Sequence, residues 1–165
     1  MKTKRTLWIK RGAACTAGAL WLGMIFYQSL CDGQTSAQYS GRLTRLLQWL
    51  LHTDRPVEGL NHLVRKIAHF AEFFLLGALV VLALVAFGLL REHSAFNRHG
   101  AVYAVLAGVL PALFDETLQL LSAGRSSRVG DVWLDWAGYL CGFVLCLFCA
   151  KTVVKSVKKR YDSKE

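Results

Sequence analysis

Residues 67–90 read IAHFAEFFLLGALVVLALVAFGLL, and no formal charge follows Glu72 in this run. About 20 consecutive apolar residues are enough for a helix to cross the ~30 Å hydrocarbon core of a bilayer. The apolar residues are continuous rather than alternating, and a segment in lipid has to satisfy its backbone hydrogen bonds internally, which favours a helix over a strand. The run therefore predicts a transmembrane helix.

Three further apolar runs of similar length lie at residues 12–30, 100–121 and 132–150. The chain has 165 residues, of which 54% are apolar, so we expect one membrane domain spanning residues 1–165. The basic start followed by the run 12–30 also has the outline of a signal peptide, but the run is long and no convincing cleavage site follows it. We predict an all-α polytopic membrane protein with four transmembrane helices and a basic tail at 151–165.

The connection between the first two runs carries a pattern of a different kind. Leucines recur at helical spacing beside Trp49, while Arg42 and Arg45 project elsewhere; the leucines are Leu43, Leu46, Leu47 and Leu50. This pattern is typical of an amphipathic helix lying in the membrane interface. Such a helix would either cover the bundle or form a roof that captures an amphiphile in the outer leaflet.

Most of the net charge of +9 lies outside the apolar runs. Binding of nucleic acid requires a basic patch on a folded soluble face, and the four runs leave no such face, so we exclude this class of partner. Basic segments flanking membrane helices tend to lie in the cytoplasm. An even number of spans and the strongly basic ends together predict that both termini are cytoplasmic.

Ionisable and polar residues interrupt or border three of the runs at matching depths. A charge at the centre of a membrane helix costs about 2.5–3.5 kcal/mol on insertion scales, so it usually faces a partner or a polar cavity. With both termini inside, every one of these residues falls in or beside the outer part of its helix. We predict one outward-facing polar site, formed by Arg65, Lys66, His69, Glu72, Asp115, Glu116, Gln119, Arg125, Asp131 and Asp135.

Five short motifs follow one another along the chain in a fixed order. They are Phe26-x-x-Ser29, Arg65-Lys66-x-x-His69-Phe70-x-Glu72-Phe73, Asp115-Glu116-x-x-Gln119, Gly124-Arg125 and Asp131-x-x-x-Asp135-x-x-Gly138. This ordered set resembles the VanZ-like family over nearly the whole chain. The resemblance implies a bacterial plasma-membrane protein with a role at the cell envelope and a link to low-level resistance to the glycopeptide antibiotic teicoplanin. It implies no reaction, and the turn after Phe26 is less rich in serine than the family pattern.

Two non-catalytic functions are open for the polar site. In one, its charges form an ion-pair network that holds the helices together as a scaffold. In the other, it binds an anionic head group, with Arg65, Lys66, Arg125 and Arg128 as a cationic rim, because a guanidinium donates two hydrogen bonds to a phosphate. A lipid-linked cell-wall intermediate or the glycopeptide itself would then be the ligand.

A third function is that of a membrane-embedded hydrolase or transferase acting on a lipid head group. The candidate catalytic residues are His69, Glu72, Asp115, Glu116 and Asp135. Neighbouring carboxylates can divide into acid and base roles, or they can hold a divalent metal that activates water. The sequence contains no HExxH motif and no serine nucleophile elbow, so it leaves open whether a reaction is catalysed and whether a metal or another cofactor takes part.

Overall fold

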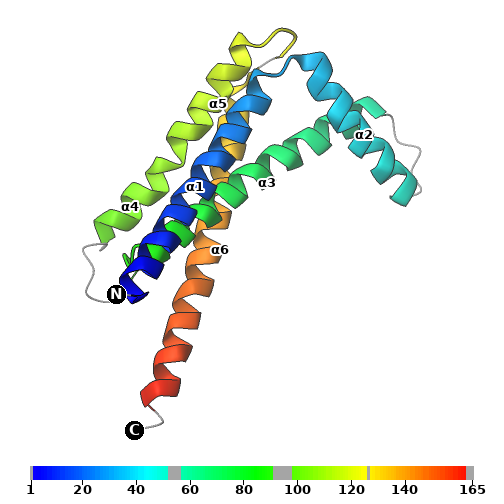
Figure 1. Cartoon of the computed structure of the whole chain (residues 1–165). Coiled ribbons are helices and arrows are strands. Elements are labelled where there is room, and N and C mark those ends of the chain that lie inside the picture. The colour runs from blue at the N-terminus through cyan, green and yellow to red at the C-terminus, as the bar shows by residue number, and fades with distance from the viewer. Residues whose placement is uncertain (1, 52–56, 91–97, 126, 163–165) are drawn as a thin grey trace.

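The computed structural model describes residues 2–51, 57–90, 98–125 and 127–162, which form six helices (Figure 1). In chain order these are α1 (Lys2–Leu30), α2 (Gly33–Leu51), α3 (Val57–Ala86), α4 (Arg98–Ala107), α5 (Val109–Leu121) and α6 (Val129–Asp162). No strand occurs among the described residues. The predicted all-α fold is therefore confirmed.

Four helical segments are long and apolar enough to cross a membrane: Lys4–Leu30, Leu60–Ala86, Val102–Leu121 and Val129–Thr152. They overlap the four predicted runs, which confirms the four-span architecture. Many of their large apolar side chains are exposed, such as those of Leu20 and Leu110, which are each 70% exposed. Soluble monomers rarely expose apolar surface on this scale, whereas lipid is a suitable neighbour for it.

The helix α3 ends at Ala86, before the limit at residue 90 that hydropathy predicts. Gly88 adopts a positive φ of 73°, and its N–H donates to the carbonyl of Val85, while the N–H of Leu89 donates to the carbonyl of Leu84, each at 2.9 Å. This pair of bonds is a Schellman motif, which stops a helix and satisfies its last carbonyls. Hydropathy missed the stop because the residues after it are still apolar.

The third span is two helices, α4 and α5, which meet at Gly108 and share one path (Figure 1). Pro111 has no N–H to bond the carbonyl of Ala107, and its ring crowds that carbonyl. The carbonyl of Ala104, whose usual partner is the N–H of Gly108, accepts a hydrogen bond of 2.7 Å from the Tyr139 hydroxyl instead. A tyrosine on α6 thus satisfies backbone that the break leaves open, as a lipid environment requires.

Close contact between α3 and α6 holds the centre of the bundle together. A Cβ on Gly138 or Gly142 would overlap the backbone of Phe70 or Phe74 on α3, and a Cβ on Gly77 would overlap the backbone of α6. Small residues let helices approach in lipid, where packing rather than water drives association. Around this crossing, α1, α3, α5 and α6 share a buried apolar core, made of Ile25, Phe73, Leu76, Val81, Ala112, Tyr139 and Phe143.

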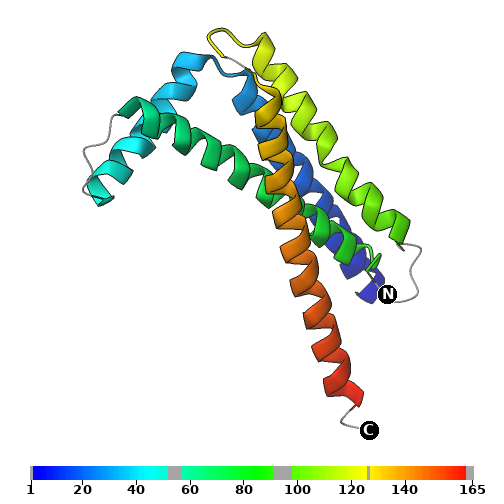
Figure 2. The ribbon, with the colours of Figure 1, turned by 180° about the vertical axis from the view of Figure 1, so that it is seen from behind.

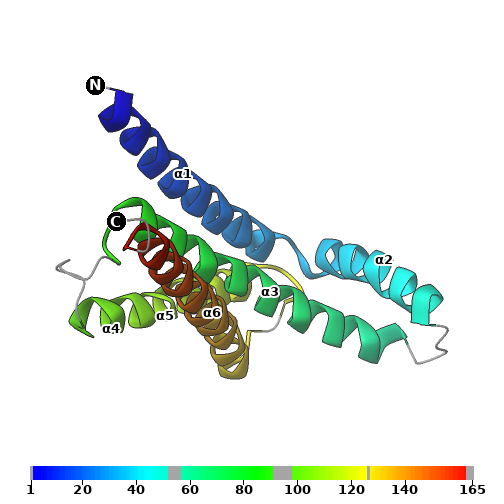
Figure 3. The same ribbon diagram turned by 90° about the horizontal axis from the view of Figure 1, so that it is seen from below.

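The helices spread apart away from this core. Figure 3 shows that the first part of α1 leans away from the other helices, and Figures 1 and 2 show that the start of α1 and the end of α6 lie at the same end, opposite the α5–α6 connection. The polar segments of α3, α5 and α6 that were predicted to meet therefore lie towards the end opposite the termini.

The helix α2 lies beside the first part of α3 (Figures 1 and 2). It begins after Asp32, whose carboxylate accepts hydrogen bonds from the N–H of Thr35 at 2.7 Å and from its hydroxyl at 3.1 Å. This is N-capping, and the bond from the Thr35 N–H is the main reason that the pKa of Asp32 is lowered.

The helical form predicted around residues 42–51 is confirmed. Leu46 and Trp49 are exposed there, while Thr44 is buried; the side chains of Leu43, Leu47 and Leu50 lie outside the described part of the structure. The position of this helix in the membrane interface stays a prediction.

Candidate functional site

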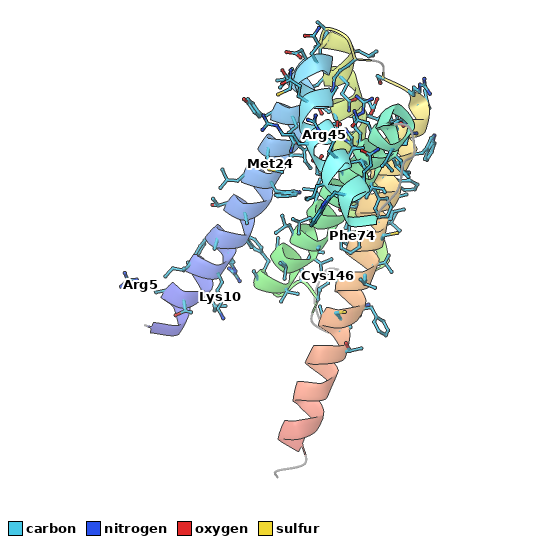
Figure 4. All side chains as sticks on the ribbon, turned by 90° about the vertical axis from the view of Figure 1, so that its right-hand side faces the viewer. Arg5, Lys10, Met24, Arg45, Phe74 and Cys146 are labelled. Atoms are coloured by element: carbon cyan, nitrogen blue, oxygen red, sulfur yellow. The ribbon has the colours of Figure 1, made fainter. Side chains whose placement is uncertain are left out.

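Polar side chains gather at the end of the bundle that carries the α5–α6 connection. In Figure 4, nitrogen and oxygen atoms are concentrated towards this end, whereas the side chains around Phe74 and Cys146 are almost entirely carbon. All ten predicted site residues come from α3, from α5, from the α5–α6 connection and from the start of α6. Their side chains differ in burial and in hydrogen-bond partners.

On α3, His69 and Glu72 are one helical turn apart, and His69 lies close to Asp115 on α5. The Nδ1 atom of His69 lies 3.9 Å from a carboxylate oxygen of Glu72 and 3.8 Å from Oδ2 of Asp115. Both distances exceed those of hydrogen bonds, and this buried nitrogen has no hydrogen-bond partner in the described part of the chain. The backbone carbonyl of Glu72 accepts a hydrogen bond of 2.9 Å from the indole of Trp21, which fixes α1 against this part of α3.

On α5, Asp115 is completely buried and is held by two side chains. Its Oδ1 accepts a hydrogen bond of 2.5 Å from the Ser29 hydroxyl on α1, and its Oδ2 accepts one of 2.9 Å from the amide of Gln119, one turn along α5. Ser29 was part of the quoted motif Phe26-x-x-Ser29, but the sequence did not indicate its partner. The structure shows that it orients Asp115.

Glu116, the next residue on α5, contacts the α5–α6 connection. Its carboxylate accepts hydrogen bonds from the Ser127 hydroxyl, from the Arg128 N–H at 3.2 Å and from the amide of Gln119 at 3.2 Å. These bonds fasten the connection to the helix that precedes it. Ser127 was missed by the sequence analysis, since a serine in a loop carries no distinguishing signal.

Arg125 fastens the same connection to the end of α1 and the start of α2. Its guanidinium donates to the carbonyls of Gln28 and Ser29 at 3.0 Å each and to the Ser36 hydroxyl at 2.9 Å. Burial, and after it the neighbouring Arg65, lowers the pKa of Arg125. The side chain that the sequence suggested as part of a cationic rim is thus largely engaged with protein oxygens.

Asp131 and Asp135 stand one turn apart on α6 and differ in their surroundings. Asp131 forms an ion pair of 2.9 Å with Lys66 at the partly exposed mouth of the site. This is the one ion pair between a carboxylate and Lys or Arg in the part of the chain that the structure describes. The extended ion-pair network of the scaffold hypothesis is not present among these residues. Asp135 is only 1% exposed, and neither of its carboxylate oxygens has a hydrogen-bond partner among the residues that the structure describes.

These groups surround a cavity of about 90 Å³. Four basic side chains, three carboxylates and several other residues line it, namely His62, Arg65, Lys66, His69, Glu116, Gln119, Arg125, Arg128, Asp131, Leu134 and Asp135. Eight of the ten predicted site residues are among them. Glu72 and Asp115 are not, although each has a carboxylate oxygen within 4 Å of the Nδ1 atom of His69. Residues of α3, α5 and α6 thus line one cavity, and its role as a binding or catalytic site stays a prediction.

Residues 15–150 match the family model described as VanZ/LLP1. The matched range contains all ten predicted site residues and the whole cavity lining. No curated protein and no solved structure matches the chain.

Proposed function

The chain belongs to the VanZ/LLP1 family, and from this premise we propose that it binds the anionic head group of an amphiphile in the cavity between α3, α5 and α6. The amphiphile would be a lipid-linked cell-wall intermediate or a glycopeptide antibiotic such as teicoplanin. Binding would take place at the outer face of the bacterial plasma membrane, with both termini in the cytoplasm. A bound glycopeptide or a bound precursor would lower the amount of antibiotic that reaches its target.

The unpaired basic side chains of the cavity carry this proposal. Lys66 is paired with Asp131, and Arg125 is bonded to backbone carbonyls. Arg65 and Arg128 both line the cavity, and neither side chain has a hydrogen-bond or ion-pair partner among the described residues. A planar guanidinium suits a phosphate because it can donate two parallel hydrogen bonds.

The size of the cavity fits a head group rather than a whole lipid. One water molecule needs roughly 10–15 Å³ of such space, so a cavity of about 90 Å³ accommodates a phosphate or pyrophosphate with some water. The tail of the ligand would lie along the apolar surface of the helices. Leu63 and Ile67 on α3, which are 52% and 58% exposed, offer such a surface next to Arg65 and Lys66.

A direct binding experiment tests the proposal. Purified protein in nanodiscs is titrated with farnesyl pyrophosphate, a short isoprenoid pyrophosphate, and with farnesol as the ligand that lacks the charge. A hydrogen bond to a charged group contributes roughly 1.5–3 kcal/mol, so Arg65→Gln should weaken pyrophosphate binding about tenfold or more. Arg45→Gln removes an exposed charge from α2 outside the cavity and should leave binding unchanged. Equal affinity for farnesol and its pyrophosphate would contradict the proposal.

The link to antibiotic susceptibility needs a measurement on cells. Cells that express the wild type or Arg65→Gln at equal membrane levels are compared for the amount of teicoplanin they bind. If the cavity affects antibiotic susceptibility, expression of the wild type changes the amount of teicoplanin that the cells bind, and expression of the variant does not. If the wild type has no effect, the antibiotic is not the relevant ligand. The pyrophosphate titration tests head-group binding independently of that result.

One observation favours a second candidate, a hydrolase or transferase acting on a lipid head group. An imidazole and two buried carboxylates, those of His69, Asp115 and Asp135, lie close together next to the cavity. Groups in such an arrangement can take acid and base roles. Release of inorganic phosphate from farnesyl pyrophosphate by the wild type, lost in His69→Gln, would favour catalysis over binding alone.

A further inference from the structure

We propose that His69, Asp115 and Asp135 form a binding site for a divalent metal cation beside the cavity. Each residue comes from a different helix, α3, α5 or α6. Each offers one ligand atom, and these three atoms lie within 4.8 Å of one another. This proposal goes beyond head-group binding, because it assigns a cation to side chains that are not part of the cationic rim.

Asp135 provides the strongest indication of a missing partner. Its side chain is 1% exposed, and neither carboxylate oxygen accepts a hydrogen bond or takes part in an ion pair among the described residues. A carboxylate that is buried in its charged form without a partner is strongly destabilising, and such a group keeps its proton unless a cation is supplied. A cation between Asp135, Asp115 and His69 would supply the partner that the protein itself does not.

Two of the four basic side chains that line the cavity are already committed, and among the described residues the other two, Arg65 and Arg128, form no ion pair with Asp135. Lys66 pairs with Asp131 at the mouth of the site, and Arg125 donates to carbonyls at the end of α1. The Nδ1 atom of His69 has no hydrogen-bond partner either, although two carboxylates lie just under 4 Å from it. A metal site requires ligand atoms that lie near one another but are not hydrogen-bonded to one another. The imidazole nitrogen of His69 and the carboxylates near it are arranged in this way.

Asp115 is held in place as a metal ligand would be. Metal-binding carboxylates are themselves hydrogen-bonded by a second layer of residues, which fixes their orientation. Ser29 donates to one oxygen of Asp115 at 2.5 Å, and Gln119 donates to the other at 2.9 Å. Both bonds leave lone pairs on the carboxylate available to an ion.

The ligand set indicates which ions to expect. Imidazole nitrogen combined with carboxylate oxygen suits Zn²⁺ or Mn²⁺ better than Ca²⁺. Bonds of about 2.0–2.2 Å would bring the ligand atoms to roughly 3–3.5 Å from one another, which needs shifts on the order of 1 Å from the distances here. His69 and Asp135 also line the cavity. A fourth position on the ion would therefore be open to water or to a group bound in the cavity.

The test is a titration of metal-free protein with Zn²⁺, followed by calorimetry and by measurement of the zinc retained after dialysis. Thiols bind zinc, and Cys146 and Cys149 are spaced one helical turn apart, so both are replaced by serine in every protein compared. We expect about one zinc per chain. Loss of one protein ligand should weaken binding at least tenfold, by analogy with the 10–100-fold cost of removing a supporting residue, so Asp135→Asn and His69→Gln should both do so.

Asp131→Asn is the matched control, because it removes a carboxylate one turn away on the same helix and outside the proposed ligand set. It should retain zinc binding within about twofold. The proposal is overturned if the wild type retains no zinc, or if Asp135→Asn and His69→Gln bind it as the wild type does.

Folding is checked on the same proteins by circular dichroism and thermal unfolding in the presence of a chelator. Without metal, Asp135→Asn should be about as stable as the wild type, because it replaces a buried carboxyl group that has no partner among the described residues by a neutral group of similar size. A variant that is folded but does not bind zinc supports the site. No lipid or antibiotic enters this experiment, so its failure would leave the proposed head-group binding untouched.

Discussion

The hydroxyl of Ser29 donates a hydrogen bond of 2.5 Å to Oδ1 of Asp115, and both side chains are completely buried. The bond joins the end of α1 to the middle of α5. The Ser122 hydroxyl donates to the Ser29 carbonyl at 2.7 Å. Ser29 therefore connects α1 both to the middle of α5 and to the residue that follows α5. A short polar chain therefore fixes the carboxylate that lies deepest in the site.

Ser29→Ala should destabilise the protein by roughly 1–3 kcal/mol, because it leaves a buried carboxylate oxygen of Asp115 without its donor. The measurement is unfolding in detergent followed by circular dichroism. Ser40→Ala is the control, since among the described residues the Ser40 hydroxyl bonds only to carbonyls of its own helix, α2. Equal stabilities of the two variants would show that the bond between α1 and α5 contributes little.

Gly142→Ala should destabilise the contact between α3 and α6 by about 1–3 kcal/mol, the usual cost of overpacking. The added methyl group would overlap the backbone of Phe74, which cannot rotate away. Gly23→Ala on α1 is the matched control, since its Cβ would meet nothing within 4 Å, and alanine favours a helix by about 1 kcal/mol over glycine. Thermal unfolding in detergent should therefore move in opposite directions for the two variants.

Hydropathy was enough to predict the four spans, because length and apolarity are what a bilayer selects. It did not predict where α3 stops or where the third span breaks. Those points depend on Gly88, on Pro111 and on the hydroxyl of Tyr139, which acts from another helix. Local backbone chemistry and a partner on another helix decide where α3 ends and where the third span breaks. A hydropathy average over many residues detects neither.

For the polar site too, the sequence predicted some features and not others. The depth of His69, Asp115 and Asp135 followed from their places along three helices. The direction in which each side chain points depends on how the helices are rotated against one another, and the sequence carries little signal for that. Arg125 and Glu116 are the clearest cases: both were expected to face a ligand, and both are largely engaged in fastening the α5–α6 connection.

The start of α2 should lose stability in acid. The pKa of Asp32 is lowered from its ordinary value near 3.8, first by the bond from the Thr35 N–H. A carboxylate with a lowered folded-state pKa stabilises the fold fully above its unfolded pKa, and this contribution is lost as the pH falls through the folded value. Asp32→Asn keeps the capping geometry but should lose this dependence. The difference in unfolding temperature between wild type and Asp32→Asn should therefore be constant above about pH 5 and shrink below pH 4.

Arg125→Lys should loosen the α5–α6 connection even though it keeps the positive charge. The guanidinium of Arg125 reaches two carbonyls and the Ser36 hydroxyl at the same time, and a lysine ammonium cannot reproduce that planar geometry. We expect a loss of about 2 kcal/mol, the size of one or two hydrogen bonds to a charged group. Faster amide hydrogen exchange in residues 122–130, with little change in α3, would locate the effect. Arg128→Lys serves as the comparison, because the exposed Arg128 side chain has no partner among the described residues. If both variants exchange alike, Arg125 does not hold the connection.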